Sequence, residues 1–374
     1  MQTKSNTVLT YPLLLGFLAS LFSEILIIVF TEQSQIGIVI ALVPVLISLV
    51  FSKFRIKLDM FLFLFLLWDA LCVVHFLITG GTYFFRVIIF QNIVYIYILA
   101  SESVVILKND FNKMRIICMI TVIIAIILGF LLHNDNVNFT YLIFALSYFV
   151  FISFDNKLLV AIVMAIVMLA LRSRSSIIMM LAVFVLWKII KKVKKKKTYA
   201  AIYVVMIVVI NFIPDIYLRI CNSSRALSIN SIIRQVTGKT LLSGRERIWP
   251  VIINSINSSL TNRLFGLGGN FLDQSYGNDL GVSSHNLFLF LRGQGGWLLV
   301  IIFCLMIYHI YMSLFEYLKD DSIAVGSAFI IAMLVRASFD LLLLANRFVD
   351  SMVMWFVVCA IIAYKNGLER TKKC

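Results

Sequence analysis

The chain has 374 residues, of which 61% are hydrophobic and 14% charged; this balance excludes a soluble globular protein of that size. Its formal net charge of +15 does not call for nucleic acid as a partner, because basic residues also mark the cytoplasmic loops of membrane proteins. Scattered cysteines without a CxxC pair indicate neither a disulfide framework nor a metal site. The composition predicts an all-α polytopic membrane protein.

Apolar runs predict about twelve transmembrane helices in one integral membrane domain, residues 1–374. The predicted spans are 10–30, 35–51, 58–78, 83–101, 113–132, 137–154, 157–171, 175–190, 198–214, 286–315, 322–344 and 348–364. Under this count, one side receives the basic residues of 53–57, 108–115, 157, 191–197 and 365–373. The positive-inside rule makes that side the cytoplasm and places both termini there.

The spans 157–171 and 175–190 are short, about 22 and about 24 Å against a hydrocarbon core of about 30 Å. The connecting stretch LRSRSS carries Arg172 and Arg174. Irregular backbone below the membrane surface is tolerated where it lines a polar cavity, so we expect this turn to line one. The alternative is a pair of arginines that snorkel from an ordinary helix end.

A long polar segment, 215–285, follows the ninth predicted helix, and the count makes it one external loop before the tenth. Cations on this outer side are nearly all arginine, whereas those on the inner side are mostly lysine. Arginine binds phosphate and carboxylate bidentately, which a topological charge does not require. The pattern predicts an anion-binding site at the outer face. The arginines near outer helix ends are Arg86, Arg172, Arg174, Arg292, Arg336 and Arg347.

Three motifs lie in or after this loop. SGRERIWP (243–250) predicts a helix start that presents Arg245 and Arg247 at an anion-favouring N-terminus. FGLGGN (265–270) is a glycine-rich turn, with a flexible connector as the alternative. SSHNLFLFLRGQGG (283–296) opens the tenth span and places His285 and Arg292 seven residues apart, on one helix face.

His285 is the candidate general base, since a neutral imidazole takes a proton from a hydroxyl near pH 7. A helix-cap or interfacial histidine is the alternative. Arg336 and Asp340 have the i, i+4 spacing of an ion pair, for which structural and functional roles are both open.

The order of LRSRSS, SGRERIW, FGLGG and SSHNLFLFLRGQGG resembles the O-antigen polymerase and O-antigen ligase superfamily over roughly residues 160–300. Members act on sugars carried by undecaprenyl pyrophosphate at the outer face of the bacterial cytoplasmic membrane. The resemblance implies that Arg172 or Arg174, together with Arg245, contacts the pyrophosphate, and that His285 matches the histidine implicated in ligases. It also implies a lipid-linked oligosaccharide substrate, with a flippase and a chain-length regulator of the same pathway as candidate partners.

The expected reaction is polymerisation of lipid-linked repeat units into a capsule, O-antigen or exopolysaccharide. It would be catalysed by a metal-independent glycosyltransferase without a cofactor, because fixed arginines can stabilise the leaving pyrophosphate. A ligase that moves finished glycan onto another acceptor is the nearest alternative. A transporter for polysaccharide or lipid-linked sugar is the alternative from another class, and a membrane-embedded scaffold is a third.

Overall fold

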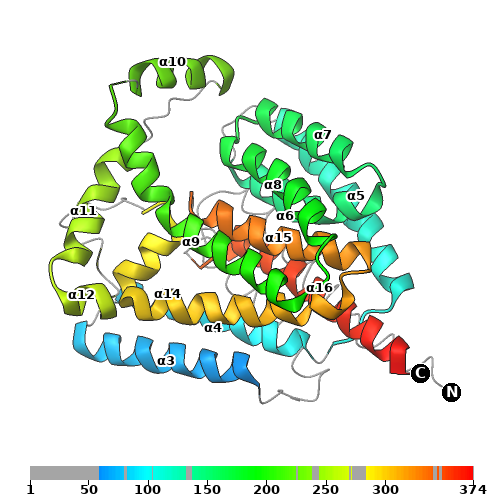
Figure 1. Ribbon diagram of the computed structural model, residues 1–374, viewed down its shortest axis with the longest axis horizontal. Helices are drawn as coiled ribbons and strands as arrows, with labels where there is room; N and C mark the ends of the chain where they lie inside the picture. The colour runs from blue at the N-terminus through cyan, green and yellow to red at the C-terminus, as the bar shows by residue number, and fades with distance from the viewer. Residues whose placement is uncertain are drawn as a thin grey trace.

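The computed structural model describes residues 59–79, 82–102, 104–131, 137–224, 226–237, 244–268, 271, 284–339, 343–344 and 348–373. Every regular element within these ranges is a helix, as the composition predicts (Figure 1). The predicted spans 10–30 and 35–51 lie outside the described residues, so the total of about twelve spans stays a prediction.

Each of the other predicted spans contains a helix, although α15 ends at Ala337, before the predicted end of its span at residue 344, and the segment 215–285 contains helices as well. The helices are α3 (Met60–Thr79), α4 (Thr82–Ser101), α5 (Lys108–Leu131), α6 (Val137–Ser153), α7 (Lys157–Ala170), α8 (Arg174–Ile190), α9 (Lys196–Cys221), α10 (Ala226–Thr237), α11 (Arg245–Asn257), α12 (Leu260–Phe265), α14 (Leu287–Ser313), the short 3-10 helix η1 (Phe315–Tyr317), α15 (Asp321–Ala337) and α16 (Phe348–Lys373).

Among the described helices, α3, α5, α9 and α14 are long and apolar enough to cross a membrane, and α6 and α7 are apolar but shorter. The apolar helices make the chain a multi-pass membrane protein. Helix α9 continues past its predicted end at residue 214 and runs through Pro214 to Cys221. A proline removes one backbone hydrogen bond without ending a membrane helix, so the polar segment starts later than the sequence predicts.

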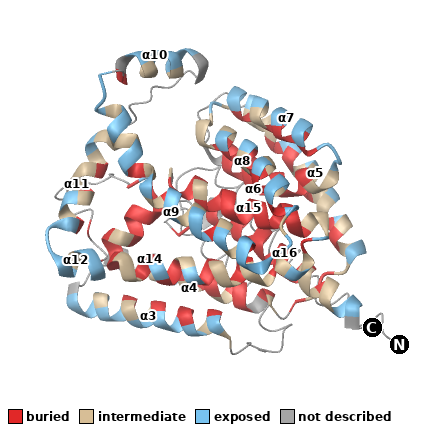
Figure 2. Cartoon of the chain, in the orientation of Figure 1, coloured by how far each residue is buried: buried red, intermediate tan, exposed pale blue. Residues whose placement is uncertain are grey.

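Helices α15 and α16 lie at the centre of the bundle and pack against α4, α6, α8, α9 and α14, whereas α10, α11 and α12 extend to one side (Figure 2). Small residues allow this packing: a side chain added at Gly326 of α15 would meet Ile361 of α16 at 3.0 Å. Aromatic contacts join the next layer, with the rings of Tyr199 and Tyr311 stacked at 4.0 Å. The outer helices α3, α5 and α7 expose apolar side chains, as a surface that faces lipid requires.

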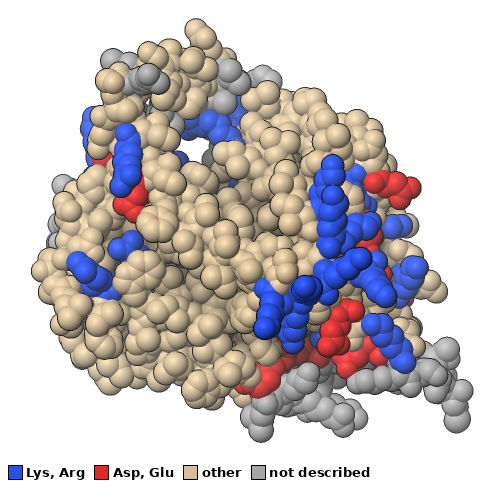
Figure 3. Space-filling model, viewed as in Figure 1, with Lys and Arg blue, Asp and Glu red and all other residues tan. Residues whose placement is uncertain are grey.

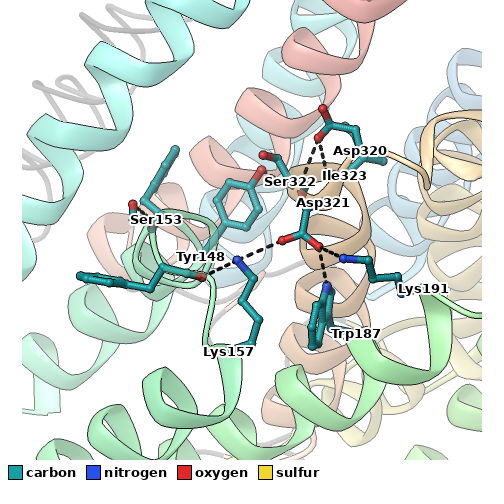
Figure 4. Close-up of polar contacts among 11 residues, drawn as sticks. Tyr148, Ser153, Lys157, Trp187, Lys191, Asp320, Asp321, Ser322 and Ile323 are labelled. Carbon is teal, nitrogen blue, oxygen red and sulfur yellow. Dashed lines mark hydrogen bonds and ion pairs between the residues drawn. The ribbon is translucent and has the colours of Figure 1, made fainter.

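One end of the bundle is fixed by two ion pairs (Figure 4). Asp321, the first residue of α15, accepts from Lys157 of α7 at 3.0 Å and from Lys191, just after α8, at 2.7 Å. The indole nitrogen of Trp187 donates to the same carboxylate at 3.1 Å. We call this the lysine end, because α9 also starts there, at Lys196. Lys157 and Lys191 therefore share one side, as the predicted topology requires.

We expect Asp321→Asn to lower the melting temperature of the detergent-solubilised protein at pH 7. Burial alone would raise the pKa of Asp321, but hydrogen bonds from Lys191, Lys157 and Trp187 outweigh it and lower the pKa. The stabilisation is thus present at neutral pH and disappears as the pH falls through that lowered pKa. Breaking a fully buried ion pair lowers the free energy of unfolding by about 3–5 kcal/mol. The loss in Asp321→Asn should be smaller, because the Asp321 side chain is 38% exposed.

Asp110→Asn is the matched control, because its partner Lys113 is 78% exposed at a distance of 3.9 Å. Its melting temperature should stay close to that of the wild type. If Asp321→Asn also melts like the wild type at pH 7, the ion pairs do not hold this end of the bundle.

Helix α14 is broken at Gly295 and Gly296, and the turn after α12 fits into the break. The amide of Leu267 donates to the carbonyl of Gly293 at 2.7 Å. A side chain at Gly266 would lie 2.6 Å from the Gly295 nitrogen, and one at Gly296 would overlap the carbonyl of Leu264. The FGLGG and RGQGG motifs therefore meet backbone to backbone, so the start of FGLGG is a packed junction and not a flexible connector.

We expect Gly296→Ala to destabilise the protein strongly, because it adds a backbone overlap to the strain of a left-handed residue at φ +65°. Gly244→Ala separates the two effects, since Gly244 has φ +88° but no atom within 4 Å of an added Cβ. The control should lose only about 1–2 kcal/mol, and Gly296→Ala should lose clearly more in thermal unfolding. Equal losses would mean that the junction relaxes freely.

Candidate functional site

The turn between α7 and α8 places Arg172 and Arg174 at the end of the bundle opposite the lysine end; we call it the arginine end. The amide of Arg172 donates to Leu169 and that of Ser173 to Met168, each at 2.9 Å. This pattern ends a helix with a left-handed residue that is usually glycine. Arg172 takes that position with φ 56°, at a cost of about 1–2 kcal/mol.

Helix α11 starts at Arg245, close to the start predicted from SGRERIWP. Ser243 lies outside the described residues; the residue before the helix, Gly244, donates its amide to Glu246 at 3.2 Å. The guanidinium of Arg245 donates through Nη2 to the carbonyl of Phe339 at 2.7 Å. Arg247, two residues further along, is exposed. Arg245 is thus fixed against the end of α15, the helix whose first residue, Asp321, lies at the lysine end.

His285 is exposed and has φ 44°, between two fully buried neighbours. The carbonyl of Ser284 accepts from the indole nitrogen of Trp249 at 2.7 Å. Asn286 caps α14 through its bond from the Leu289 amide and donates through Nδ2 to the carbonyl of Ser338 at 2.7 Å. The imidazole therefore projects from a backbone held on both sides.

Among the described residues, Arg172 and His285 are the two non-glycine residues with positive φ. Such a conformation persists where the surrounding structure fixes it, and it is a reason to suspect function. The sequence predicts a functional role for both residues from their chemistry.

The end of α15 brings the separate segments together. Ser338 and Phe339 are adjacent, and their carbonyls hold Asn286 and Arg245. The charge of Arg245 in turn acts on Arg174, and so does Tyr217 of α9. Arg245 is thus close to the backbone that carries His285, and its charge reaches Arg174. Like charges held together favour binding of an anion between them.

Arg292 lies elsewhere, which corrects the prediction that it shares a helix face with His285. His285 precedes α14, which begins at Leu287. The guanidinium carbon of Arg292 lies 4.7 Å from the ring centroid of Trp297, and its charged neighbours are Asp215 and Arg263. Arg292 therefore belongs to a second group of charged residues.

The other candidates have different surroundings. Arg336 is buried, with its guanidinium over the rings of Tyr141 and Phe144 at 4.5 and 4.7 Å. Its predicted partner Asp340 and the candidate Arg347 lie outside the described residues, as does the side chain of Arg86. Trp249 and Asn286, which hold the backbone on either side of His285, are not among the residues predicted from the sequence. Asn286 could have been found, because an asparagine before an apolar run is a helix-start signal.

One group among the described residues has donor atoms close enough to hold a metal ion: Asp59, Glu102 and His309, with atoms within 4.8 Å of one another. His309 Nε2 and Asp59 Oδ2 are 3.4 Å apart. Asp59 precedes α3 and Glu102 follows α4. This group is separate from the arginine site, whose groups are donors suited to an anion.

Figure 3 shows basic side chains where α8 passes into α9 and a separate group beside α11 and α12. The fold and this geometry define a class: an all-helical, multi-pass membrane protein with an arginine-rich site where its helices end. The sequence profile of the Wzy_C family, described as O-antigen ligase, matches residues 159–304. This segment therefore resembles the Wzy_C domain, as the resemblance of its motifs to the O-antigen ligase and polymerase superfamily predicts.

The matched segment contains Arg172, Arg174, Arg245, His285 and Arg292. The family takes part in surface polysaccharide assembly and implies a glycan-transferring enzyme with a lipid-linked glycan as substrate. No curated protein and no solved structure matches the chain.

Proposed function

We propose that this protein polymerises undecaprenyl-pyrophosphate-linked oligosaccharide repeat units into a surface polysaccharide. The reaction takes place at the outer face of a bacterial cytoplasmic membrane, on the side of the arginine end. The observation that carries the proposal is the convergence of Arg174 and Arg245, with His285 on a backbone tied to the same end of α15.

In the proposed reaction, an acceptor hydroxyl attacks the anomeric carbon of the donor sugar. The bond between that carbon and the pyrophosphate oxygen breaks, and the lipid pyrophosphate leaves with an additional negative charge. Arg174 and Arg245 stabilise this charge as fixed donors, which requires no reorganisation during the reaction. The exposed Arg172 and Arg247 are close in sequence to them and attract the same anion.

His285 takes the proton of the acceptor hydroxyl as the new glycosidic bond forms. The exposed imidazole is accessible from outside, and its fixed backbone keeps it in one place. Positioned general bases typically contribute about 10²–10⁴-fold. In this scheme the arginines act on the donor and His285 acts on the acceptor, so their substitutions should have separable effects.

A ligase that transfers finished glycan to a different acceptor is the second candidate, because the matching family is described as O-antigen ligase. Both enzymes use the same class of donor, and the proposed roles of the arginines apply to both. They differ in the acceptor: another repeat unit for the polymerase, and a lipid or other anchor for the ligase.

The test is complementation of a strain that lacks the gene. We expect the deletion strain to accumulate single lipid-linked repeat units at the outer face, and the restored gene to produce a ladder of chain lengths on gels. Attachment of chains that were already long would identify a ligase instead. Precursors that remain on the cytoplasmic side would identify a transporter and contradict an enzyme at the outer face.

A further inference from the structure

The break in α14 forms an unusual pair from Arg292 and Trp297. In a continuous helix, residues five apart are separated by about 140° around the axis and about 7.5 Å along it, so their side chains do not stack. Here the guanidinium carbon of Arg292 lies 4.7 Å from the centroid of the Trp297 ring. The non-helical backbone at Gly295 and Gly296 separates these two residues and permits the pair.

Two charged residues from other helices complete the group. Asp215 of α9 and Arg263 of α12 both act electrostatically on Arg292. Helix α12 is fixed at this place by the bond from Leu267 to the Gly293 carbonyl. Asp215 and Arg263 are exposed, whereas Arg292 and Trp297 are half-buried. Within the described part of the chain, the buried Nε of Arg292 has no hydrogen-bond acceptor.

This combination of side chains fits a saccharide. Guanidinium groups donate to ring and hydroxyl oxygens, a carboxylate accepts from hydroxyls, and an indole packs against the apolar face of a sugar ring. The carboxylate of Asp215 repels a phosphate, which makes this group different from the Arg174 and Arg245 pair.

The group also lies next to the proposed donor site. Asp215 is two residues before Tyr217, whose ring lies 5.0 Å from that of Trp249 and whose hydroxyl is 3.4 Å from Glu246. Tyr217 also acts on Arg174. Residues two apart are separated by about 200° around a helix axis, so α9 lies between the two groups of arginines.

We propose that Asp215, Arg263, Arg292 and Trp297 form a saccharide subsite that holds the acceptor glycan. The assignment of this subsite to the acceptor rests on the proposed transfer function. The proposal that the subsite binds a saccharide does not depend on that function.

The experiment measures binding by calorimetry with purified protein. The probe is the oligosaccharide that mild acid releases from the lipid-linked repeat unit, the donor whose transfer by the purified protein is also measured. It therefore carries no lipid and no pyrophosphate. We expect saturable binding to the wild type, and a dissociation constant raised about tenfold or more in Asp215→Asn, Arg292→Gln and Trp297→Ala. Trp187→Ala, at the lysine end, is the matched control and should bind like the wild type.

Two further measurements separate the possible outcomes. Phosphatidylglycerol vesicles are titrated in parallel: binding of vesicles but not of oligosaccharide would overturn the proposal in favour of an anionic lipid headgroup. In the transfer assay, Asp215→Asn and Arg292→Gln should raise the KM for the acceptor and leave donor binding unchanged.

Wild-type affinity and wild-type acceptor KM in these variants, at wild-type melting temperature, would also overturn the proposal. Specific oligosaccharide binding by a protein that transfers nothing would instead refute the proposed function and keep the subsite.

Discussion

Replacing Arg245 or Arg174 by lysine is expected to slow glycan transfer roughly tenfold to a hundredfold. Lysine keeps the positive charge but cannot bind a phosphate through two parallel donors. Loss of one charge-assisted hydrogen bond is worth about 1.5–3 kcal/mol, which corresponds to that change in rate. Alanine at either position should cost more, because it also removes the charge that faces the leaving group. The measurement is turnover of lipid-linked donor by purified variants, per folded molecule.

Two controls separate this effect from a structural one. Arg245 also donates to the Phe339 carbonyl at 2.7 Å, so the melting temperature of Arg245→Lys must be compared with that of the wild type. Arg234→Lys, on the exposed surface of α10, should keep full activity. If Arg174 and Arg245 hold one pyrophosphate, the double variant should lose less than the product of the single losses. Normal turnover in both single variants would remove the arginines from the mechanism.

Replacing His285 by glycine is expected to lower transfer by about 10²–10⁴-fold while donor binding stays normal. The backbone of His285 has φ 44°, which glycine adopts without strain and alanine does not. His285→Gly thus removes the imidazole and relieves the strain of the positive φ, whereas His285→Ala removes the imidazole and keeps the strain that the histidine already carries. Both variants should lose transfer, and both should melt close to the wild type.

The pH dependence gives an independent readout. A base must be neutral to take a proton, so wild-type transfer should rise with pH through the range in which an imidazole loses its proton. The glycine variant should lack this rise. His309→Ala, at the lysine end, is the control and should keep it. A fully active His285→Gly would show that the turn matters and the imidazole does not.

Within the described residues, the sequence predicted most of the long helices and pointed to candidate residues at the arginine end. Hydropathy and basic residues located the spans, since these depend on composition along one segment. LRSRSS and SGRERIW pointed to Arg174 and Arg245 because arginine on the side opposite the lysines is a chemical anomaly in a single sequence. Their proximity could not be predicted, since it depends on Phe339, whose contribution is a backbone carbonyl.

The wrong prediction about Arg292 has a local physical cause. Counting seven residues from His285 assumes that the helix includes His285, but Asn286 caps α14 and puts the histidine outside it. The break at Gly295 and Gly296 was equally hidden, because adjacent glycines show only that special backbone angles are possible. Here these angles permit a junction with the turn after α12. That turn belongs to FGLGGN (265–270), which the sequence identifies only as a glycine-rich turn.

The carbonyls of Ser338 and Phe339, at the end of α15, also limit which fragment of the chain can carry this site into another protein. The segment that matches the family ends at residue 304, but the acceptors for Arg245 and Asn286 belong to Phe339 and Ser338. A fragment cut at the family boundary would carry both arginines and the histidine and lack the groups that hold them in place. Chimeras that exchange substrate specificity between relatives therefore need their downstream crossover after residue 339, so that the motifs and their supports come from one parent.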